Sequence, residues 1–258
     1  MSDDSSLPIH AVLPQLKAAL AAGPNAVLVA PPGAGKTTAV APALLGEDWC
    51  TGEILLLSPR RVAARAAAER MAAMLGEKPG ETIGYLTRLD SKRSAKTRVT
   101  VLTEAIFLNR IVAAPELPGV SAVLFDEAHE RHLDSDFGLA LALETQGVLR
   151  EDLRLLVMSA TLDGERFAGL MPNGKRACPV IESEGRSHPL RIEWLGSSGT
   201  QRFEDAMADA VAQAWRAEEG DILAFLPGVR EIEWVRERLE DRLRGAVILP
   251  LHGQVDPA

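Results

Sequence analysis

The chain of 258 residues is 47% hydrophobic and 25% charged, with a formal net charge of −8. This composition fits a globular protein of one or two domains and excludes a generally basic nucleic-acid coat, while the two cysteines, Cys50 and Cys178, exclude a disulfide framework and a cysteine metal cluster. No apolar run approaches about 18 residues, and residues 1–10 lack the basic and apolar regions of a secretion signal. We therefore expect a cytoplasmic protein without membrane association.

Strand and helix patterns alternate along the first two thirds of the chain. Apolar residues at helical spacing predict a first helix over residues 8–22, and short apolar runs bounded by turns predict the strands that follow. The predicted strands cover residues 26–30, 53–58, 82–87, 98–103, 122–125 and 153–158, and further helices cover residues 36–45, 59–75, 104–113 and 135–149. This order predicts an α/β fold with a doubly wound parallel sheet.

A phosphate-binding loop joins the first predicted strand to the next helix. Gly33 and Gly35 allow consecutive backbone N–H groups to point at an anion, because glycine has no Cβ to block the approach. Lys36 can reach the β- and γ-phosphates of a nucleotide, and the Thr37 hydroxyl can ligate Mg²⁺ at the positive end of the helix dipole. The pattern predicts a P-loop NTPase. The predicted nucleotide-binding residues are Gly33, Ala34, Gly35, Lys36, Thr37 and Thr38.

Two acids directly follow the predicted strand over residues 122–125. Asp126 can hold Mg²⁺ through its water shell, and Glu127 can orient or deprotonate an attacking water. Because parallel strands carry functional groups at their carboxyl ends, we expect the first, fifth and sixth predicted strands to end side by side. The sequence therefore predicts a metal-assisted nucleotide site. Its predicted catalytic residues are Lys36, Asp126 and Glu127.

Five segments, in their order along the chain, resemble the motifs of superfamily 2 DEAH-box helicases. They are Gly33–Thr38, Pro59–Arg65, Thr103–Glu104, Asp126–Arg131 and Ser159–Thr161. The segments PRRVAAR, DEAHER and FLPG are most similar to those of the bacterial HrpB-type ATP-dependent helicases. The resemblance implies RecA-like domains, ATP with Mg²⁺ as the bound nucleotide, and single-stranded nucleic acid as partner, RNA in preference to DNA.

The resemblance also implies roles for individual residues. His129, Ser159 and Thr161 would couple the state of the nucleotide to domain movement. The residues that would lie near the nucleic-acid backbone are Arg60, Arg61, Thr103 and, in the segment Gly84–Arg88, Arg88. Outside these roles, His10 and His132 are assigned no chemistry, and each is expected to cap a helix or to pack.

A second α/β pattern begins after Thr161. Its predicted strands cover residues 191–194, 221–226 and 246–251, and its predicted helices cover residues 201–217 and 229–244. The expected organisation is a RecA-like ATP-binding domain over residues 1–178, a linker over residues 179–190 and part of a second RecA-like domain over residues 191–258. The family's later motifs, among them the source of its arginine fingers, have no match, so we expect nucleotide binding without unwinding.

Three functions are compatible with these residues. The first is an ATP-dependent RNA helicase in which hydrolysis drives movement along a single strand. The second is a nucleotide-binding module or adaptor that holds ATP or ADP without productive turnover. A P-loop kinase is disfavoured, because no segment of the sequence resembles an acceptor-binding lid.

Overall fold

Strands and helices alternate in the structure much as the sequence predicts. The computed structural model describes residues 7–161, 164–174, 176–184, 190–196 and 199–252, and the chain divides into two compact units, residues 1–187 and 188–258. The strands of the first unit are β1 (Asn25–Val29), β2 (Glu53–Ser58), β3 (Ile83–Leu86), β4 (Ser91–Lys92), β5 (Val99–Thr103), β6 (Val120–Phe125), β7 (Arg154–Ser159) and β8 (Val180–Glu182). Its helices are α1 (Ile9–Ala22), α2 (Lys36–Leu44), α3 (Arg61–Met74), α4 (Glu104–Ala113), α5 (Leu133–Val148), α6 (Gly164–Leu170) and the short 3₁₀ helix η2 (Ala128–Glu130).

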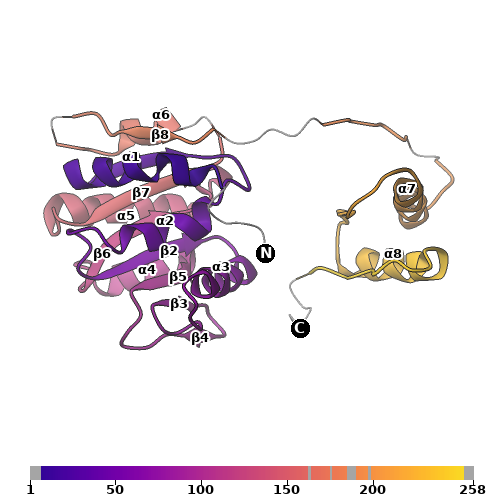
Figure 1. Cartoon of the computed structure of the whole chain (residues 1–258), viewed down its shortest axis with the longest axis horizontal. Coiled ribbons are helices and arrows are strands. Elements are labelled where there is room, and N and C mark those ends of the chain that lie inside the picture. The colour runs from indigo at the N-terminus through magenta and orange to yellow at the C-terminus, as the bar shows by residue number, and fades with distance from the viewer. Residues whose placement is uncertain (1–6, 162–163, 175, 185–189, 197–198, 253–258) are drawn as a thin grey trace. The chain divides into compact units, whose positions relative to one another are not determined.

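All eight strands of the first unit belong to one sheet (Figure 1). The strand order is β4-β3-β5-β2-β6-β7-β1-β8, and every neighbouring pair is parallel except β3 and β4. The connections between these parallel strands run through the intervening helices, except between β3 and β5, where the chain passes through the short strand β4. The prediction of an α/β fold with a mostly parallel sheet is confirmed.

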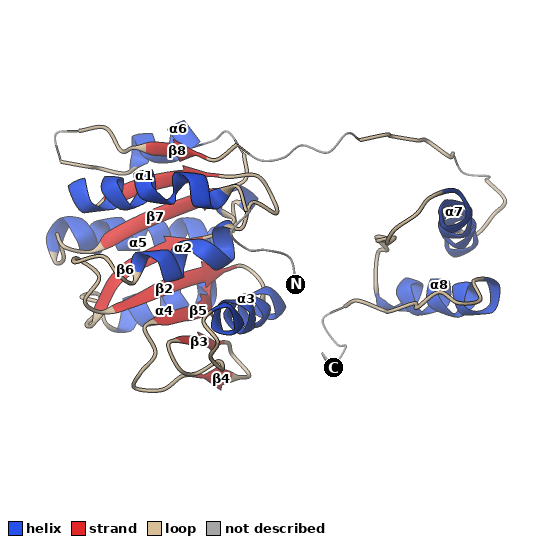
Figure 2. Ribbon diagram, in the orientation of Figure 1, coloured by secondary structure: helices blue, strands red, loops and turns tan. Residues whose placement is uncertain are grey.

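Helices cover both faces of this sheet (Figure 2). On one face α1, α2 and α3 pack against alternate strand residues such as Leu28 and Leu56. On the other face α4, α5 and α6 pack against the strand residues that alternate with these, such as Val27 and Leu55. The central strands are buried on both sides, which explains their continuous apolar runs. Among the described residues, no helix has both the length and the apolar character needed to span a membrane.

The edge strand β8 departs from the sequence prediction. The sequence predicts a linker over residues 179–190, but Val180–Glu182 pairs in parallel with β1, where Val27 lies opposite Val180. Without this strand, the outer backbone groups of β1 would have no partner in the sheet. Ile181 is 1% exposed and adds its side chain to the core. The boundary predicted at residue 178 therefore falls before the last strand of the first sheet.

In the part of the second unit that the structure describes, two helices pack together, α7 (Phe203–Ala217) and α8 (Val229–Arg242). Their shared core consists of Ala208, Ala212, Val235, Leu239 and Leu243. Strands were expected over residues 191–194, 221–226 and 246–251, but none of these described segments forms a strand, so that prediction is wrong. An apolar run becomes a strand only when a neighbouring strand accepts its backbone hydrogen bonds. Here Phe225 remains 80% exposed.

Candidate functional site

Seven parallel strands end along one side of the first sheet, which we call the carboxyl edge, and six of these ends carry residues singled out by the sequence. In sheet order, the strand ends carry Arg88 after β3, Thr103 on β5, Arg60 after β2, Asp126 after β6, Ser159 on β7 and the P-loop after β1. The ends of β6, β7 and β1 are neighbours, as predicted. The carboxyl edge therefore has a nucleotide half, formed by β6, β7 and β1, beside a half that bears the predicted nucleic-acid residues.

The P-loop between β1 and α2 has the backbone that its glycines predict. Gly33 and Gly35 have φ angles of 78° and 93°, which residues with a side chain rarely adopt. Ala34 is buried, and the Thr38 hydroxyl lies 3.5 Å from the Gly35 carbonyl oxygen. Lys36 opens α2 directly after Gly35, so the first N–H groups of this helix face the loop.

Two contacts join the P-loop to the acids after β6. The Lys36 ammonium lies 2.9 Å from Oε1 of Glu127, and the Thr37 hydroxyl donates a hydrogen bond to Oδ2 of Asp126 at 2.5 Å. Lys36 is 4% exposed, so Glu127 supplies the opposite charge that its burial requires. Hydroxyl and carboxylate oxygens are ligands that Mg²⁺ accepts, so the donor set of Thr37 and Asp126 fits this ion.

The electrostatics of Asp126 follow from its burial beside Lys36. Burial raises the pKa of the Asp126 carboxyl to about 6, while the Thr37 hydrogen bond and the Lys36 charge act in the opposite direction. The backbone N–H of Glu127 donates to Oδ1 of Asp126 at 2.9 Å. A divalent cation at these oxygens would favour the ionised carboxylate.

Glu127 holds a backbone conformation that is uncommon for a residue with a side chain. Its φ is 52°, and such strained residues concentrate at functional sites. The left-handed turn at Glu127 precedes η2 and directs the following residues back toward β7. The acid that faces Lys36 is therefore held by a specific turn, which we call the DEAH turn, residues 126–131.

The predicted coupling residues connect the DEAH turn to the end of β7. The Ala160 N–H donates to Nδ1 of His129 at 3.2 Å, and the Thr161 N–H donates to the Ser159 hydroxyl at 3.2 Å. Nδ1 of His129 also lies 3.4 Å from Glu127. Because Nδ1 already accepts the Ala160 hydrogen bond, it has no proton to donate to Glu127. His129 thus joins two neighbouring strand ends.

The predicted nucleic-acid residues lie on the β3, β5 and β2 half of the carboxyl edge. Arg60, Arg61 and Arg88 are exposed, and Thr103 is half-buried at the start of α4. The Arg60 side chain is 73% exposed, and its guanidinium lies 3.3 Å from Oε1 of Glu130 in the DEAH turn. The two halves of the carboxyl edge are therefore joined by the ion pair between Arg60, which follows β2, and Glu130, which follows β6.

Three side chains at this meeting point, Glu104, Glu130 and His132, were given no site role by the sequence. His132 directly precedes α5, but its side chain makes no capping hydrogen bond. Its two ring nitrogens instead lie 3.3 Å from carboxylate oxygens of Glu104 and Glu130. No local pattern could have shown this cluster, because Glu104 comes from a different strand end.

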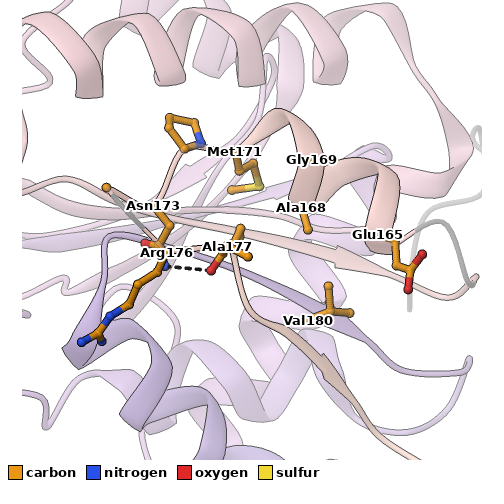
Figure 3. A pocket seen from close by; sticks show the side chains of 11 residues that line it. Glu165, Ala168, Gly169, Met171, Asn173, Arg176, Ala177 and Val180 are labelled. Carbon is orange, nitrogen blue, oxygen red and sulfur yellow. Dashed lines mark hydrogen bonds between the residues drawn. The ribbon is translucent and has the colours of Figure 1, made fainter.

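A separate pocket lies beside α6 and the segment before β8 (Figure 3). It has a volume of about 480 Å³, and the Asn173 side-chain amide lies 3.5 Å from the Ala177 carbonyl oxygen at its wall. Residues 171–178 precede β8, so this wall lies toward the amino ends of the strands. None of the predicted site residues lines the pocket.

Comparison with protein families agrees with the geometry of the carboxyl edge. The DEAD/DEAH box helicase family profile matches residues 11–168, which include the P-loop and the DEAH turn. The matched region is more than half of the chain.

Individual relatives are similar over most of the chain. ATP-dependent RNA helicase HrpB of Escherichia coli is 48% identical over 250 residues, which are 96% of this chain and 30% of that protein. Probable ATP-dependent RNA helicase DHR2 of Saccharomyces cerevisiae is 34% identical over 88% of this chain and 31% of its own length. A crystal structure of the E. coli DEAH/RHA helicase HrpB superposes with a TM-score of 0.86 and 47% identity, over 92% of this chain and 30% of that one. The chain thus spans about 30% of these relatives.

Proposed function

Because the chain belongs to the DEAD/DEAH box helicase family, we propose that its first unit binds ATP and supplies the catalytic groups for its hydrolysis. In a protein of the relatives' length, hydrolysis would drive movement along single-stranded RNA, with DNA as the less favoured strand. The observation that carries this proposal is the pair of contacts from Lys36 to Glu127 and from Thr37 to Asp126. They bring both halves of a nucleotide-hydrolysis site together. We propose the cytoplasm as the location of this activity.

The roles of the site residues follow from charge and position. The P-loop N–H groups and the Lys36 ammonium bind the phosphates, while Thr37 and Asp126 hold Mg²⁺. When bound, Mg²⁺ neutralises charge that develops on the phosphate oxygens. Glu127 exchanges its contact with Lys36 for the attacking water, because the phosphates then engage the ammonium. Its carboxylate orients that water and accepts its proton.

The link between β6 and β7 supports the coupling roles that we propose for three residues. A movement of Glu127 shifts the DEAH turn and reaches the end of β7 through the hydrogen bond from Ala160 to His129. We propose that His129, Ser159 and Thr161 transmit the nucleotide state in this way. The segment between β8 and residue 191 and a second RecA-like domain that includes residues 191–258 would receive it.

The nucleic acid binds, in this proposal, across the exposed half of the carboxyl edge. Arg60, Arg61 and Arg88 offer guanidinium groups to phosphates, and the Thr103 hydroxyl offers a further hydrogen bond. Such contacts do not depend on base identity, so binding is expected to be tolerant of sequence and sensitive to salt. Arginine fingers are worth about 10³–10⁵ in rate, so full turnover is proposed to need parts of the relatives that this chain does not span.

ATP turnover with and without single-stranded RNA tests the proposal. We expect Mg²⁺-dependent ATP binding by the chain, which Lys36→Ala abolishes without unfolding the protein. Arg65→Ala, which removes an exposed pair with Glu69, is the control and should bind ATP normally. RNA should stimulate hydrolysis once a segment that completes the second domain is supplied.

The alternative hypothesis, a nucleotide-binding adaptor, predicts that RNA does not stimulate hydrolysis in the same assay. Tight nucleotide binding without RNA-stimulated hydrolysis, even with the completing segment present, would favour a nucleotide-binding module. Unchanged ATP affinity in Lys36→Ala would refute the P-loop assignment itself.

A further inference from the structure

Four charged or titratable side chains form a continuous set of contacts between the two halves of the carboxyl edge. We call Arg60, Glu130, His132 and Glu104 the bridging cluster. Arg60 lies 3.3 Å from Oε1 of Glu130, Oε2 of Glu130 lies 3.3 Å from Nε2 of His132, and Nδ1 of His132 lies 3.3 Å from Oε2 of Glu104. These residues come from the ends of β2, β6 and β5 and from the residue before α5. The cluster thus connects the DEAH turn with two strand ends of the nucleic-acid half.

His132 is the central member because each of its ring nitrogens faces a different carboxylate. A neutral imidazole has one N–H and donates to one acceptor only, whereas an imidazolium donates from both nitrogens. A protonated His132 therefore satisfies Glu104 and Glu130 together. Loss of that proton leaves one of these contacts without a donor.

The surroundings of His132 are dominated by acids. The Glu104 side chain is 9% exposed, and burial raises the pKa of its carboxyl, while His132 and the Ser135 hydroxyl act in the opposite direction. Asp134 adds a further negative charge near Glu104. Arg131 is engaged by Asp136 at 2.7 Å. Among the groups described as acting on Glu104, His132 is the one whose protonated form supplies positive charge.

Arg60 gives the cluster its sensitivity to a bound strand. Its side chain is 73% exposed, so a phosphate can reach the guanidinium and compete with Glu130 for it. Glu130 would then keep only its contact with His132. Because Glu130 ends the short helix η2 that follows Glu127, a change in its contacts acts on the turn that faces Lys36.

We propose that His132 is a positioning residue that ties the DEAH turn to the first turn of α4, and that its protonated form makes nucleotide affinity respond to RNA bound at Arg60. This inference rests on the proposed function, since it requires a nucleotide at the P-loop and a nucleic acid at the exposed half of the edge. It assigns to His132 and Glu104 a role in coupling and none in chemistry.

The test measures the coupling between two ligands on the 258-residue chain. The affinity for a fluorescent, non-hydrolysable ATP analogue is determined with Mg²⁺, in the presence and absence of poly(U). For the wild type we expect poly(U) to change this affinity by about fivefold or more, within the usual range for coupled sites. In His132→Gln and in Glu104→Gln the change should fall below about twofold, while affinity without poly(U) stays the same.

A pH series separates positioning from a merely structural role. The wild-type coupling should decline as the pH is raised, because an imidazole that has lost its proton can donate to only one of the two carboxylates. His132→Gln should show no such decline. Asp136→Asn is the matched control, because it removes the carboxylate charge that pairs with Arg131 near the same turn but leaves the bridging cluster intact. It should couple as the wild type does.

The possible results distinguish this inference from the proposed function. A wild type that binds no ATP analogue would refute the proposed function. A wild type that binds both ligands without coupling, or variants that couple as the wild type does at every pH, would overturn the role of His132 alone. Thermal unfolding monitors each variant, and if His132→Gln fails to fold, Glu104→Gln gives the same decision.

Discussion

Asp126→Asn is expected to stabilise the metal-free protein at neutral pH while abolishing Mg²⁺-dependent nucleotide binding. The wild-type carboxylate is 3% exposed and accepts hydrogen bonds from the Thr37 hydroxyl and the Glu127 N–H. An asparagine carbonyl can accept the Glu127 hydrogen bond, and its amide can donate to the Thr37 oxygen. The substitution therefore removes a buried charge and keeps the shape of the site.

The size and sign of the effect follow from the pKa of Asp126. Burial raises this pKa from 3.8 to about 6, so the folded protein keeps a proton that the unfolded chain releases. The free energy of unfolding therefore falls as pH rises through this interval, by about 1.4 kcal/mol per pKa unit, or about 3 kcal/mol in total. Since Lys36 loses an attractive neighbour in the variant, we expect a net gain of about 1–3 kcal/mol above pH 6.

Urea and thermal unfolding in a metal chelator, across a pH series, measure this difference. Near pH 4 the two proteins should have nearly the same stability, and above pH 6 the variant should melt several degrees higher, at about 2–4 °C per kcal/mol. Asp152→Asn is the matched control with the opposite sign, because Arg150 lowers the pKa of the Asp152 carboxyl. An Asp126→Asn variant that is less stable than the wild type at pH 7.5 would refute this account.

Two further substitutions and one chemical modification probe the same unit. Gly35→Ala should destabilise the chain by about 1–2 kcal/mol and weaken nucleotide binding in a titration. The φ angle of Gly35 is 93°, and an added Cβ would lie 2.8 Å from the Leu7 side chain. A variant as stable as the wild type would contradict this prediction. Glu127→Gln should bind ATP normally but reduce single-turnover hydrolysis by about 10²–10⁴, and an unchanged rate would exclude Glu127 as the base. Burial raises the pKa of the Cys178 thiol to about 11, so a thiol reagent at pH 8 should modify it only after urea unfolding.

The geometry that joins the P-loop to the acids after β6 could be predicted because its signals are local and its assembly follows a general rule. Gly33 and Gly35 mark a backbone that other residues rarely adopt, and Asp126 stands at the end of an apolar run. Parallel strands bring such ends to one edge of a sheet. The contact from Thr37 to Asp126 joins residues 89 positions apart, yet the order of strands was sufficient to anticipate it.

The wrong strand predictions concern apolar segments whose structure depends on whether a neighbouring strand is available for pairing. Val180–Glu182 became a strand because the free edge of β1 was available, although the surrounding residues indicated a linker. Residues 221–226 carry a strand pattern but have no neighbouring strand among the described residues, so they do not form one. Hydrophobic pattern sets which face of a segment can be buried, whereas pairing depends on what lies beside it.

The sequence by itself determined the α/β class, the P-loop and the acids of the DEAH turn, because backbone freedom, charge and apolar periodicity are properties of short segments. Only the tertiary structure decided that Lys36 pairs with Glu127, that β8 closes the sheet, and that His132 lies between Glu104 and Glu130. These contacts depend on the direction of each side chain after the strands have packed. Ring nitrogens and carboxylates carry no local signal of the partner that folding brings within 3.3 Å.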